Sequence, residues 1–172
     1  MPRGHTRGHN APVAMVALIS FVVASRAEAW AQSLPTLQSL PQEVQASIQD
    51  SAKECGAEKV VLKWGFIVAE DVNDDGVDDY ILDYGKFVCG NTQTYFCGSA
   101  GCLTQVFVSI PNGKYVKVLD EPVRELRFAH DAQGRPEMLL DLHGSACGKS
   151  GAAPCSVTLL WNGHTFFETR RK

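Results

Sequence analysis

The chain has 172 residues, of which 20% are charged and 45% hydrophobic, and its formal net charge is −3. This composition is ordinary for one globular domain and excludes a disordered or fibrous chain. The mild acidity gives no electrostatic reason to expect binding to nucleic acid or to an anionic membrane, because both require clustered positive charge.

Residues 1–31 are predicted to be a secretory signal peptide. Two arginines precede an apolar stretch at residues 11–25, and Ala29-Trp30-Ala31 has small residues at the spacing that signal peptidase accepts. Cleavage is therefore expected before Gln32, with Ala27-Glu28-Ala29 as a competing site. The apolar stretch is shorter than the roughly 20 residues that cross a bilayer, which disfavours an uncleaved anchor. The mature protein is expected to be periplasmic or secreted, without membrane attachment.

The mature chain is predicted to begin with a polar tether at residues 32–40, followed by a single β-rich domain over residues 41–172. A short helix is predicted over residues 41–55, because Pro41 suits a helix start and Gly56 suits a stop. One face of this helix is apolar, through Val44, Ile48 and either Ala52 or Cys55. The helix is therefore expected to pack this stripe on the rest of the domain.

From Val60 onward the apolar period changes from helical to two. One strand is predicted with its apolar face made by Val60, Leu62, Trp64, Phe66 and Val68. We expect the bulky aromatic residues of the chain to be core rather than ligand platforms, namely Trp64, Trp161, Phe66, Phe107, Phe128 and Phe166.

The remaining strands fall into two similar units, at residues 60–119 and 123–169. At an offset of 58 positions the matches are Gly76 with Gly134, Asp79 with Glu137, residues 81–83 with 139–141, and Cys89 with Cys147. In both units a glycine-rich insert is followed by a strand, an Asn-Gly turn (Asn112-Gly113 or Asn162-Gly163) and a last strand. A duplicated four-stranded antiparallel meander is predicted, so the fold is mainly β, as a sandwich or as a single twisted sheet.

Residues 71–79, with the sequence DVNDDGVDD, have the pattern of a calcium-binding loop. Calcium is held by six to eight oxygen atoms from a flexible, largely anionic segment with a glycine at its sharp turn. Gly76 supplies the turn. The expected ligands are Asp71, Asn73, Asp75, the carbonyl of Val77, and Asp79. The competing interpretation is a solvated acidic turn, since Asp, Asn and Gly all favour turns.

Two features separate this loop from a helix-loop-helix calcium site. Its twelfth position is Leu82 instead of a bidentate Glu, and the predicted flanks, residues 66–70 and 80–84, are strands. Asp83 or water is needed to complete the shell. Affinity is expected on the order of 10⁻⁴ to 10⁻³ M, which suits a structural ion outside the cytoplasm. The second unit has Ala129, Asp131, Gln133 and Glu137 at the ligand positions, so one ion is expected.

The motif Asp-x-Asn-x-Asp-Gly-x-x-Asp between two strands resembles the calcium loops of FG-GAP or VCBS repeats, over residues 66–84. That resemblance implies the same ligand set. The whole chain also resembles small periplasmic proteins of proteobacteria that combine such a loop with a Cys-Gly-Ser-Ala-Gly-Cys insert, here residues 97–102, and a closing Trp-Asn-Gly turn at residues 161–163. This second resemblance brings no activity with it. Two units are too few to close a propeller.

The even number of cysteines in an exported chain predicts three disulfides among Cys55, Cys89, Cys97, Cys102, Cys147 and Cys155. Cys147 is expected to bond Cys155. By analogy between the units Cys89 is expected to bond Cys97 or Cys102, which leaves the other for Cys55. The competing interpretation is a zinc site made by Cys97, Cys102, Cys147 and His143.

No convergent catalytic set is visible, so the protein is predicted not to be an enzyme. Ser99 and Ser145 with His130, His143 or His164 would be the candidate nucleophiles and bases, but no strand-to-helix elbow surrounds either serine. The first hypothesis is a calcium-stabilised module that binds a protein or glycan in the cell envelope. The alternative is an inhibitor of a wall-degrading enzyme such as lysozyme, with a disulfide-held loop as the inserted wedge.

Overall fold

The computed structural model describes Met1 and residues 36–171. The predicted signal peptide and residues 32–35 of the predicted tether therefore lie outside the described segment of the chain, apart from Met1. Residues 36–171 belong to one compact unit. Over residues 36–171, no helix has the length and apolar character of a membrane span.

The domain begins with a one-turn helix, η1 (Leu37–Ser39), and the helix α1 (Gln42–Glu54). Helix α1 confirms the predicted helix within one residue at each end, with Pro41 at its N-cap and Gly56 in a left-handed conformation after it. Leu40 is buried and packs with α1. The folded part thus includes the end of the segment that was predicted to be a tether.

The strands confirm a mainly β fold made of antiparallel sheets. Their bounds are β1 (Val60–Leu62), β2 (Ile67–Glu70), β3 (Asp79–Asp83), β4 (Phe87–Cys89), β5 (Cys97–Gly98), β6 (Gly101–Ile110), β7 (Lys114–Val123), β8 (Glu125–His130), β9 (Pro136–Leu142), β10 (Cys155–Trp161) and β11 (Phe166–Arg171). One-turn helices η2 (Tyr84–Lys86) and η3 (Gly144–Cys147) follow β3 and β9. A five-stranded sheet contains β2, β3, β5, β6 and β7, a four-stranded sheet contains β8 to β11, and β1 pairs with β4.

The two predicted units share one strand path. In the first unit β2, β3, β6 and β7 pair in succession, and in the second β8, β9, β10 and β11 do the same. In each unit the pairing of the third strand with the fourth shifts register by one residue, because Val118 of β7 and Thr169 of β11 have no residue opposite them. The second unit is the predicted four-stranded meander. The first has in addition the short strand β5, which pairs with the start of β6.

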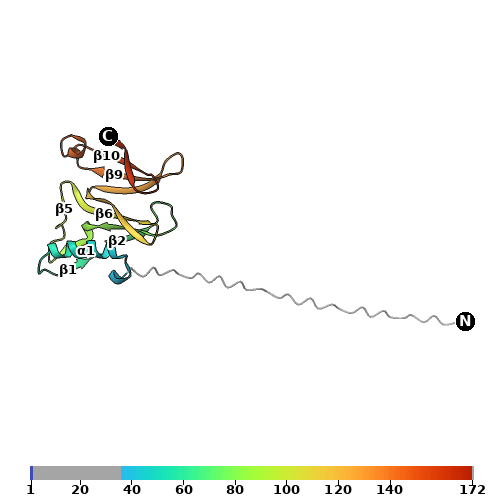
Figure 1. Cartoon of the computed structure of the whole chain (residues 1–172), viewed down its shortest axis with the longest axis horizontal. Helices are drawn as coiled ribbons and strands as arrows, with labels where there is room; N and C mark the ends of the chain where they lie inside the picture. The colour runs from blue at the N-terminus through green and yellow to red at the C-terminus, as the bar shows by residue number, and fades with distance from the viewer. Residues whose placement is uncertain (2–35, 172) are drawn as a thin grey trace. The chain divides into compact units, whose positions relative to one another are not determined.

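The sheets form layers, as Figure 1 shows with the four-stranded sheet at the top and α1 with β1 at the bottom. One core lies between the two larger sheets and joins Ile81, Val106 and Val108 to Met138 and Leu140. The other face of the five-stranded sheet packs on α1 and β4, through Val44, Ile48, Leu82, Phe87 and Phe107. Both faces of this sheet are buried. The two larger sheets therefore form a sandwich, which decides between the two predicted arrangements.

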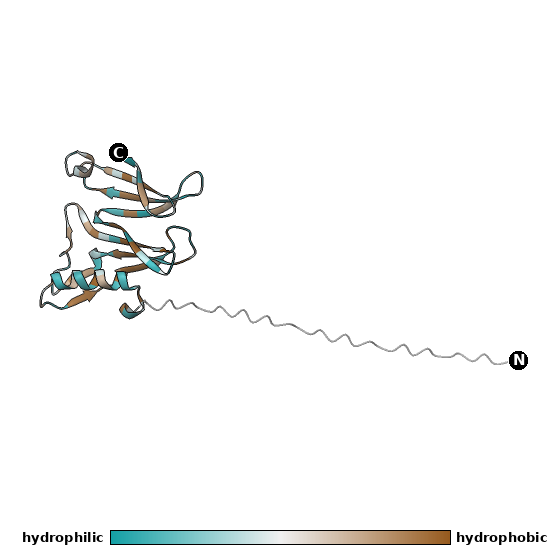
Figure 2. Ribbon diagram, viewed as in Figure 1, coloured by the Kyte–Doolittle hydropathy of each residue, from teal (hydrophilic) through white to brown (hydrophobic). Residues whose placement is uncertain are grey.

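Figure 2 shows the same layering in its colours, because brown segments recur along the facing strands while teal dominates the outer face of α1 and several turns.

The single strand predicted from the alternation of apolar residues between Val60 and Val68 was wrong. The chain does not continue as one strand from Val60 to Val68, because the amide of Phe66 donates to the carbonyl of Lys63 at 3.1 Å and closes a turn. Gly65 has φ +81°, which suits glycine. Trp64, at the tip of this turn, is 82% exposed and is not a core residue.

The disulfides are Cys55–Cys89, Cys97–Cys102 and Cys147–Cys155. The last pairing confirms the prediction. The predicted bond from Cys89 to Cys97 or Cys102 was wrong, because the β5–β6 hairpin places Cys97 directly opposite Cys102, whereas Cys89 lies at the end of β4 beside the C-terminal end of α1. No cysteine is free, so the alternative zinc site is excluded.

Candidate functional site

The predicted calcium loop connects β2 to β3 at one end of the five-stranded sheet. Val72 is buried in the core between the two larger sheets and anchors the start of the loop. Asp74 and Gly76 both have positive φ, at 61° and 83°, so the chain turns sharply on either side of Asp75. This geometry directs several side chains of the loop back toward its own backbone.

Two of the predicted ligands converge on one backbone amide. The amide of Asp75 donates to Asp71 Oδ1 at 3.2 Å and to Asn73 Oδ1 at 3.1 Å. Asp71 Oδ2 also accepts from the amide of Gly76 at 2.8 Å. Asp71 and Asn73 thus have their oxygen atoms close together on the inside of the turn.

Asp75 connects the loop to β6. Its Oδ1 accepts from the amide of Val77 at 2.8 Å, and its Oδ2 accepts from Asn73 Nδ2 at 3.2 Å and from the hydroxyl of Ser109. Ser109 is buried at the end of β6 and was missed in the sequence. The available signal was a hydroxyl residue inside the otherwise apolar segment Val106-Phe107-Val108-Ser109-Ile110.

Asp79 lies behind the loop and is fully buried. Its Oδ2 accepts from the amide of Val72 at 2.9 Å and its Oδ1 from the amide of Ser109 at 2.7 Å, so it joins the loop to β6. Burial raises the pKa of the Asp79 carboxyl to about 6; the two backbone hydrogen bonds oppose this shift, and the charges of Asp75 and Asp71 add to it. The chain therefore keeps a carboxylate in a place that disfavours its charge.

The equivalent loop of the second unit has a different charge balance. Asp131, which corresponds to Asn73, accepts hydrogen bonds from the amides of Gln133 and Arg135, each at 2.9 Å. The guanidinium of Arg135 also donates to Asp131, from Nε at 2.8 Å. A basic side chain thus neutralises the carboxylate of the second loop.

No Lys or Arg forms an ion pair with the carboxylates of the first loop, as far as residues 36–171 are described. A histidine is the one titratable nitrogen group paired with a carboxylate of this loop within the described residues: His130, at the end of β8, has its Nε2 2.8 Å from Asp74 Oδ2. Asp74 is not a predicted ligand. The loop therefore has five Asp residues, and those among them that are predicted ligands have no basic partner. Repulsion between these carboxylates destabilises the loop unless a cation binds.

The predicted ligand set fits calcium by chemistry, since it offers carboxylate, amide and carbonyl oxygens. In the described part of the chain, no cluster of three or more Asp, Glu, His or Cys side chains is arranged to hold a metal ion. Asp79 in particular directs both oxygens at backbone amides. Asp83 lies at the far end of β3, roughly 13 Å along the strand from Asp79, and accepts from the amide of Gly85. Water is thus the better candidate to complete a shell.

A groove of about 800 Å³ opens beside the loop. Asn73, Asp75 and Val77 form one side of it. The other sides come from the two Asn-Gly turns and their neighbours, which include Tyr115, Trp161 and His164. The lining has one carboxylate and no Lys or Arg, so a bound partner would meet aromatic rings, amides and the ligand side of the loop.

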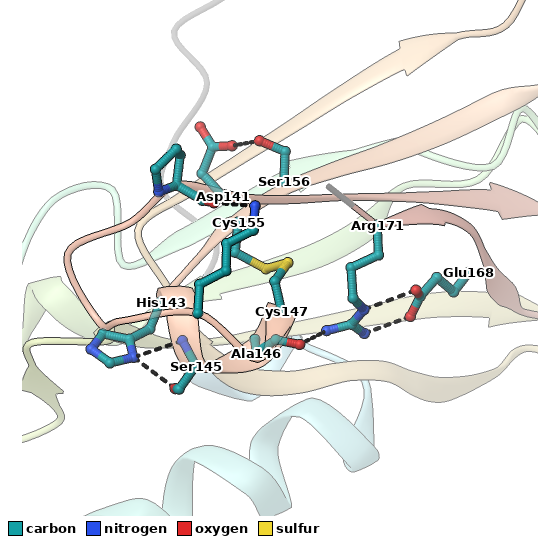
Figure 3. Close-up of a disulfide and its surroundings, with 11 residues drawn as sticks. Asp141, His143, Ser145, Ala146, Cys147, Cys155, Ser156, Glu168 and Arg171 are labelled. Carbon is teal, nitrogen blue, oxygen red and sulfur yellow. Dashed lines mark hydrogen bonds and ion pairs between the residues drawn. A yellow bond between two sulfur atoms is a disulfide. The ribbon is translucent and has the colours of Figure 1, made fainter.

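The serines considered as nucleophiles have structural roles. The carbonyl of Ser99 accepts from Arg124 Nη2 at 3.1 Å. Ser145 Oγ lies 2.7 Å from His143 Nδ1, and the amide of Ser145 donates to the same atom, so His143 caps the one-turn helix η3 (Figure 3). No carboxylate within residues 36–171 is hydrogen-bonded to His143 in the way that a catalytic triad requires.

The surroundings of Cys147–Cys155 in Figure 3 are similarly structural. Asp141 accepts from Ser156 Oγ at 2.9 Å, and Arg171 pairs with Glu168 and donates to the carbonyl of Ala146. These contacts hold the disulfide loop on the last strand.

Comparison of the chain with family models, with curated proteins and with solved structures finds no match.

Proposed function

We propose that this protein is an exported, non-enzymatic calcium-binding module that recognises a protein or glycan in the periplasm. The observation that supports this proposal best is that the two equivalent loops differ in how their carboxylates are neutralised. In the second loop Arg135 neutralises Asp131, whereas the first loop has Asp71, Asp75 and Asp79 with no basic partner in the described part of the chain. A bound divalent cation would supply the missing positive charge.

Two further features support the proposal. Three disulfides are typical of proteins that fold in an oxidising compartment such as the periplasm. The groove beside the loop places aromatic and amide groups next to the ligand side chains, and such surfaces suit sugars and peptides. An ion in the loop would then hold β2, β3 and the end of β6 in register while it shapes one wall of the groove.

Calcium is expected to stabilise the chelator-treated protein. With a dissociation constant on the order of 10⁻³ M, 10 mM calcium should raise the free energy of unfolding by about 1.4 kcal/mol. Asp75→Asn should abolish this gain, because it removes the charge at the centre of the ligand set. Urea unfolding with and without calcium measures both effects.

Asp78→Asn is the matched control, since Asp78 is an exposed carboxylate of the same loop and is not a predicted ligand. This variant should keep most of the calcium response. Isothermal titration that detects no calcium uptake by the unmodified protein would remove the proposal, as would equal losses in the two variants.

A second candidate function is inhibition of a wall-degrading enzyme such as lysozyme. The observation that favours it is Arg124, whose Nη2 donates to the carbonyl of Ser99 at 3.1 Å and to the carbonyl of Gly151 at 2.8 Å. Arg124 thereby joins the Cys97–Cys102 loop to the Cys147–Cys155 loop, and two rigid loops side by side suit insertion into an enzyme cleft.

This candidate predicts that a molar excess of the purified protein slows lysozyme digestion of cell walls. Arg124→Gln should weaken that inhibition, because the two loops lose their shared donor. Arg127→Gln is the control, since Arg127 lies on β8, three residues after Arg124, and forms ion pairs with Glu125 and Asp141 instead. Unchanged lysozyme activity in the presence of the unmodified protein would rule this function out.

A further inference from the structure

The Cys97–Cys102 disulfide differs from the other two in its exposure. Both of its cysteines are half-buried, in the hairpin of β5 and β6. Each of the other disulfides has at least one fully buried cysteine, since Cys89 and Cys155 are each 1% exposed. A reagent from solution can therefore approach Cys97–Cys102 from either cysteine, whereas Cys147–Cys155 offers only the half-buried Cys147 and both cysteines of Cys55–Cys89 are buried.

Access to this disulfide is provided by a groove of about 950 Å³, which is lined by Gly98, Ser99, Gly101 and Cys102 on one side and by β8 on another. Gly85 contributes to the opening, because a Cβ atom at that position would lie 3.2 Å from the Sγ atom of Cys102. The absence of a side chain at Gly85 leaves this face of the sulfur uncovered.

Little secondary structure depends on the bond. It closes a separation of only 5 residues, and β5 pairs with β6 over two positions. The closed conformation is nevertheless specific, since Gly101 has φ +109° and a Cβ atom there would lie 2.0 Å from the carbonyl oxygen of Val123. The loop is thus a small flap against the end of β7 that the disulfide keeps closed.

We propose that Cys97–Cys102 is a thiol–disulfide exchange site whose reaction partner is a dithiol reductant. One thiolate of the dithiol attacks Sγ of Cys102 and forms a mixed disulfide, while the electron pair of the broken bond leaves on Sγ of Cys97, which takes up a proton. The second thiolate of the reductant attacks the reductant's own sulfur in the mixed disulfide and releases the thiolate of Cys102, which takes up the second proton that the dithiol lost. Two electrons pass to the protein, and the dithiol becomes a disulfide.

The charges around the groove allow this approach. Its lining has three basic residues, Lys86, Arg124 and Arg127, and three acidic ones, Glu70, Asp83 and Glu125, so it carries no net charge that would repel an incoming thiolate. Opening the bond frees the flap, so that Ser99 loses its fixed position under Arg124. Exchange at this site therefore controls one wall of the groove and one of the two loops that Arg124 joins.

The test is reduction of the folded, full-length mature protein by graded dithiothreitol, with alkylation and peptide mass mapping at each time. Cys97 and Cys102 are expected to be alkylated at least about tenfold faster than the other four cysteines, with the circular dichroism spectrum retained. Opening of Cys147–Cys155 first, or of all three bonds at one rate, would overturn the proposal.

Gly85→Ala provides the second measurement, because alanine at this position adds a methyl group over Cys102 Sγ. Gly85 does not have a positive φ, so alanine fits the backbone conformation, and its Cβ atom, 3.0 Å from Asp83 Oδ1, requires that carboxylate to shift by a few tenths of an ångström. The exchange rate of Cys97–Cys102 should fall several-fold in this variant, whereas the rate of Cys147–Cys155 should not change. An unchanged rate at Cys97–Cys102 contradicts the proposed attack on Cys102 from the groove.

Discussion

Replacement of Asp79 by alanine is expected to lower the free energy of unfolding by about 2–3 kcal/mol at pH 7 in the absence of calcium. The carboxylate is fully buried and accepts the amides of Val72 and Ser109, at 2.9 and 2.7 Å. Alanine leaves both amides without an acceptor, and each unsatisfied buried donor costs about 1–3 kcal/mol. Part of this loss is offset, because the variant no longer buries a charge.

The cost of Asp79→Ala should depend on pH. The folded-state pKa of Asp79 is raised to about 6 from the usual 3.8, so the folded protein holds a proton that the unfolded chain releases. This group therefore favours folding most below about pH 4, and that contribution is lost as pH rises to about 6. The cost of the alanine variant should be larger at pH 4 than at pH 7, by about 2 kcal/mol.

Urea unfolding of the unmodified protein and the variant, at pH 4 to 7 with a chelator, measures this difference. Asp78→Ala is the control, because Asp78 is exposed and its side chain accepts no hydrogen bond within the described residues. Its effect should stay within about 0.5 kcal/mol at every pH. A cost of Asp79→Ala that grows with pH would contradict the role assigned to its burial.

The repeated architecture was accessible from the sequence because it depends on local periodicity. The offset of 58 positions correctly related β3 to β9, and the Asn-Gly turns correctly marked the hairpins of β6 with β7 and of β10 with β11. Each of these signals lies within a few residues of the structure it predicts. The four-stranded second unit was predicted for the same reason.

The features that were missed depend on contacts between distant parts of the chain. Ser109 joins the loop through its place at the end of β6, which lies 34 positions after Asp75. Trp64 matched the alternation of its neighbours, but the turn at Gly65 moved it to the surface. Strand periodicity could not reveal this turn, because apolar residues stand on both sides of it.

The pairing of Cys89 was missed because the analogy between the units does not extend to α1. The second unit has no preceding helix to supply a cysteine, so its pair forms within the unit, between Cys147 and Cys155. In the first unit α1 covers the outer face of the sheet, and Cys55 follows its last turn. Cys89 therefore bonds Cys55 at the end of the helix, and the two cysteines of the β5–β6 hairpin bond each other.

Removal of this helix-anchoring disulfide, by Cys55→Ala with Cys89→Ala, should have the largest effect of any disulfide removal in the protein. The bond closes a separation of 34 residues, against 8 for Cys147–Cys155 and 5 for Cys97–Cys102. The loss of loop-closure entropy predicts a cost of about 3–4 kcal/mol for the first bond and about 2 kcal/mol for the shortest.

Urea unfolding at pH 7 of this double variant and of Cys97→Ala with Cys102→Ala compares the two bonds directly. We expect the order of cost to follow the length of chain that each bond closes, and Cys55–Cys89 adds the burial of Cys89 to its effect. An equal or larger cost for the half-buried hairpin bond would mean that the flap is needed for folding. Because the hairpin bond is proposed to open in the folded protein, the domain must remain folded without it, which requires the smaller cost.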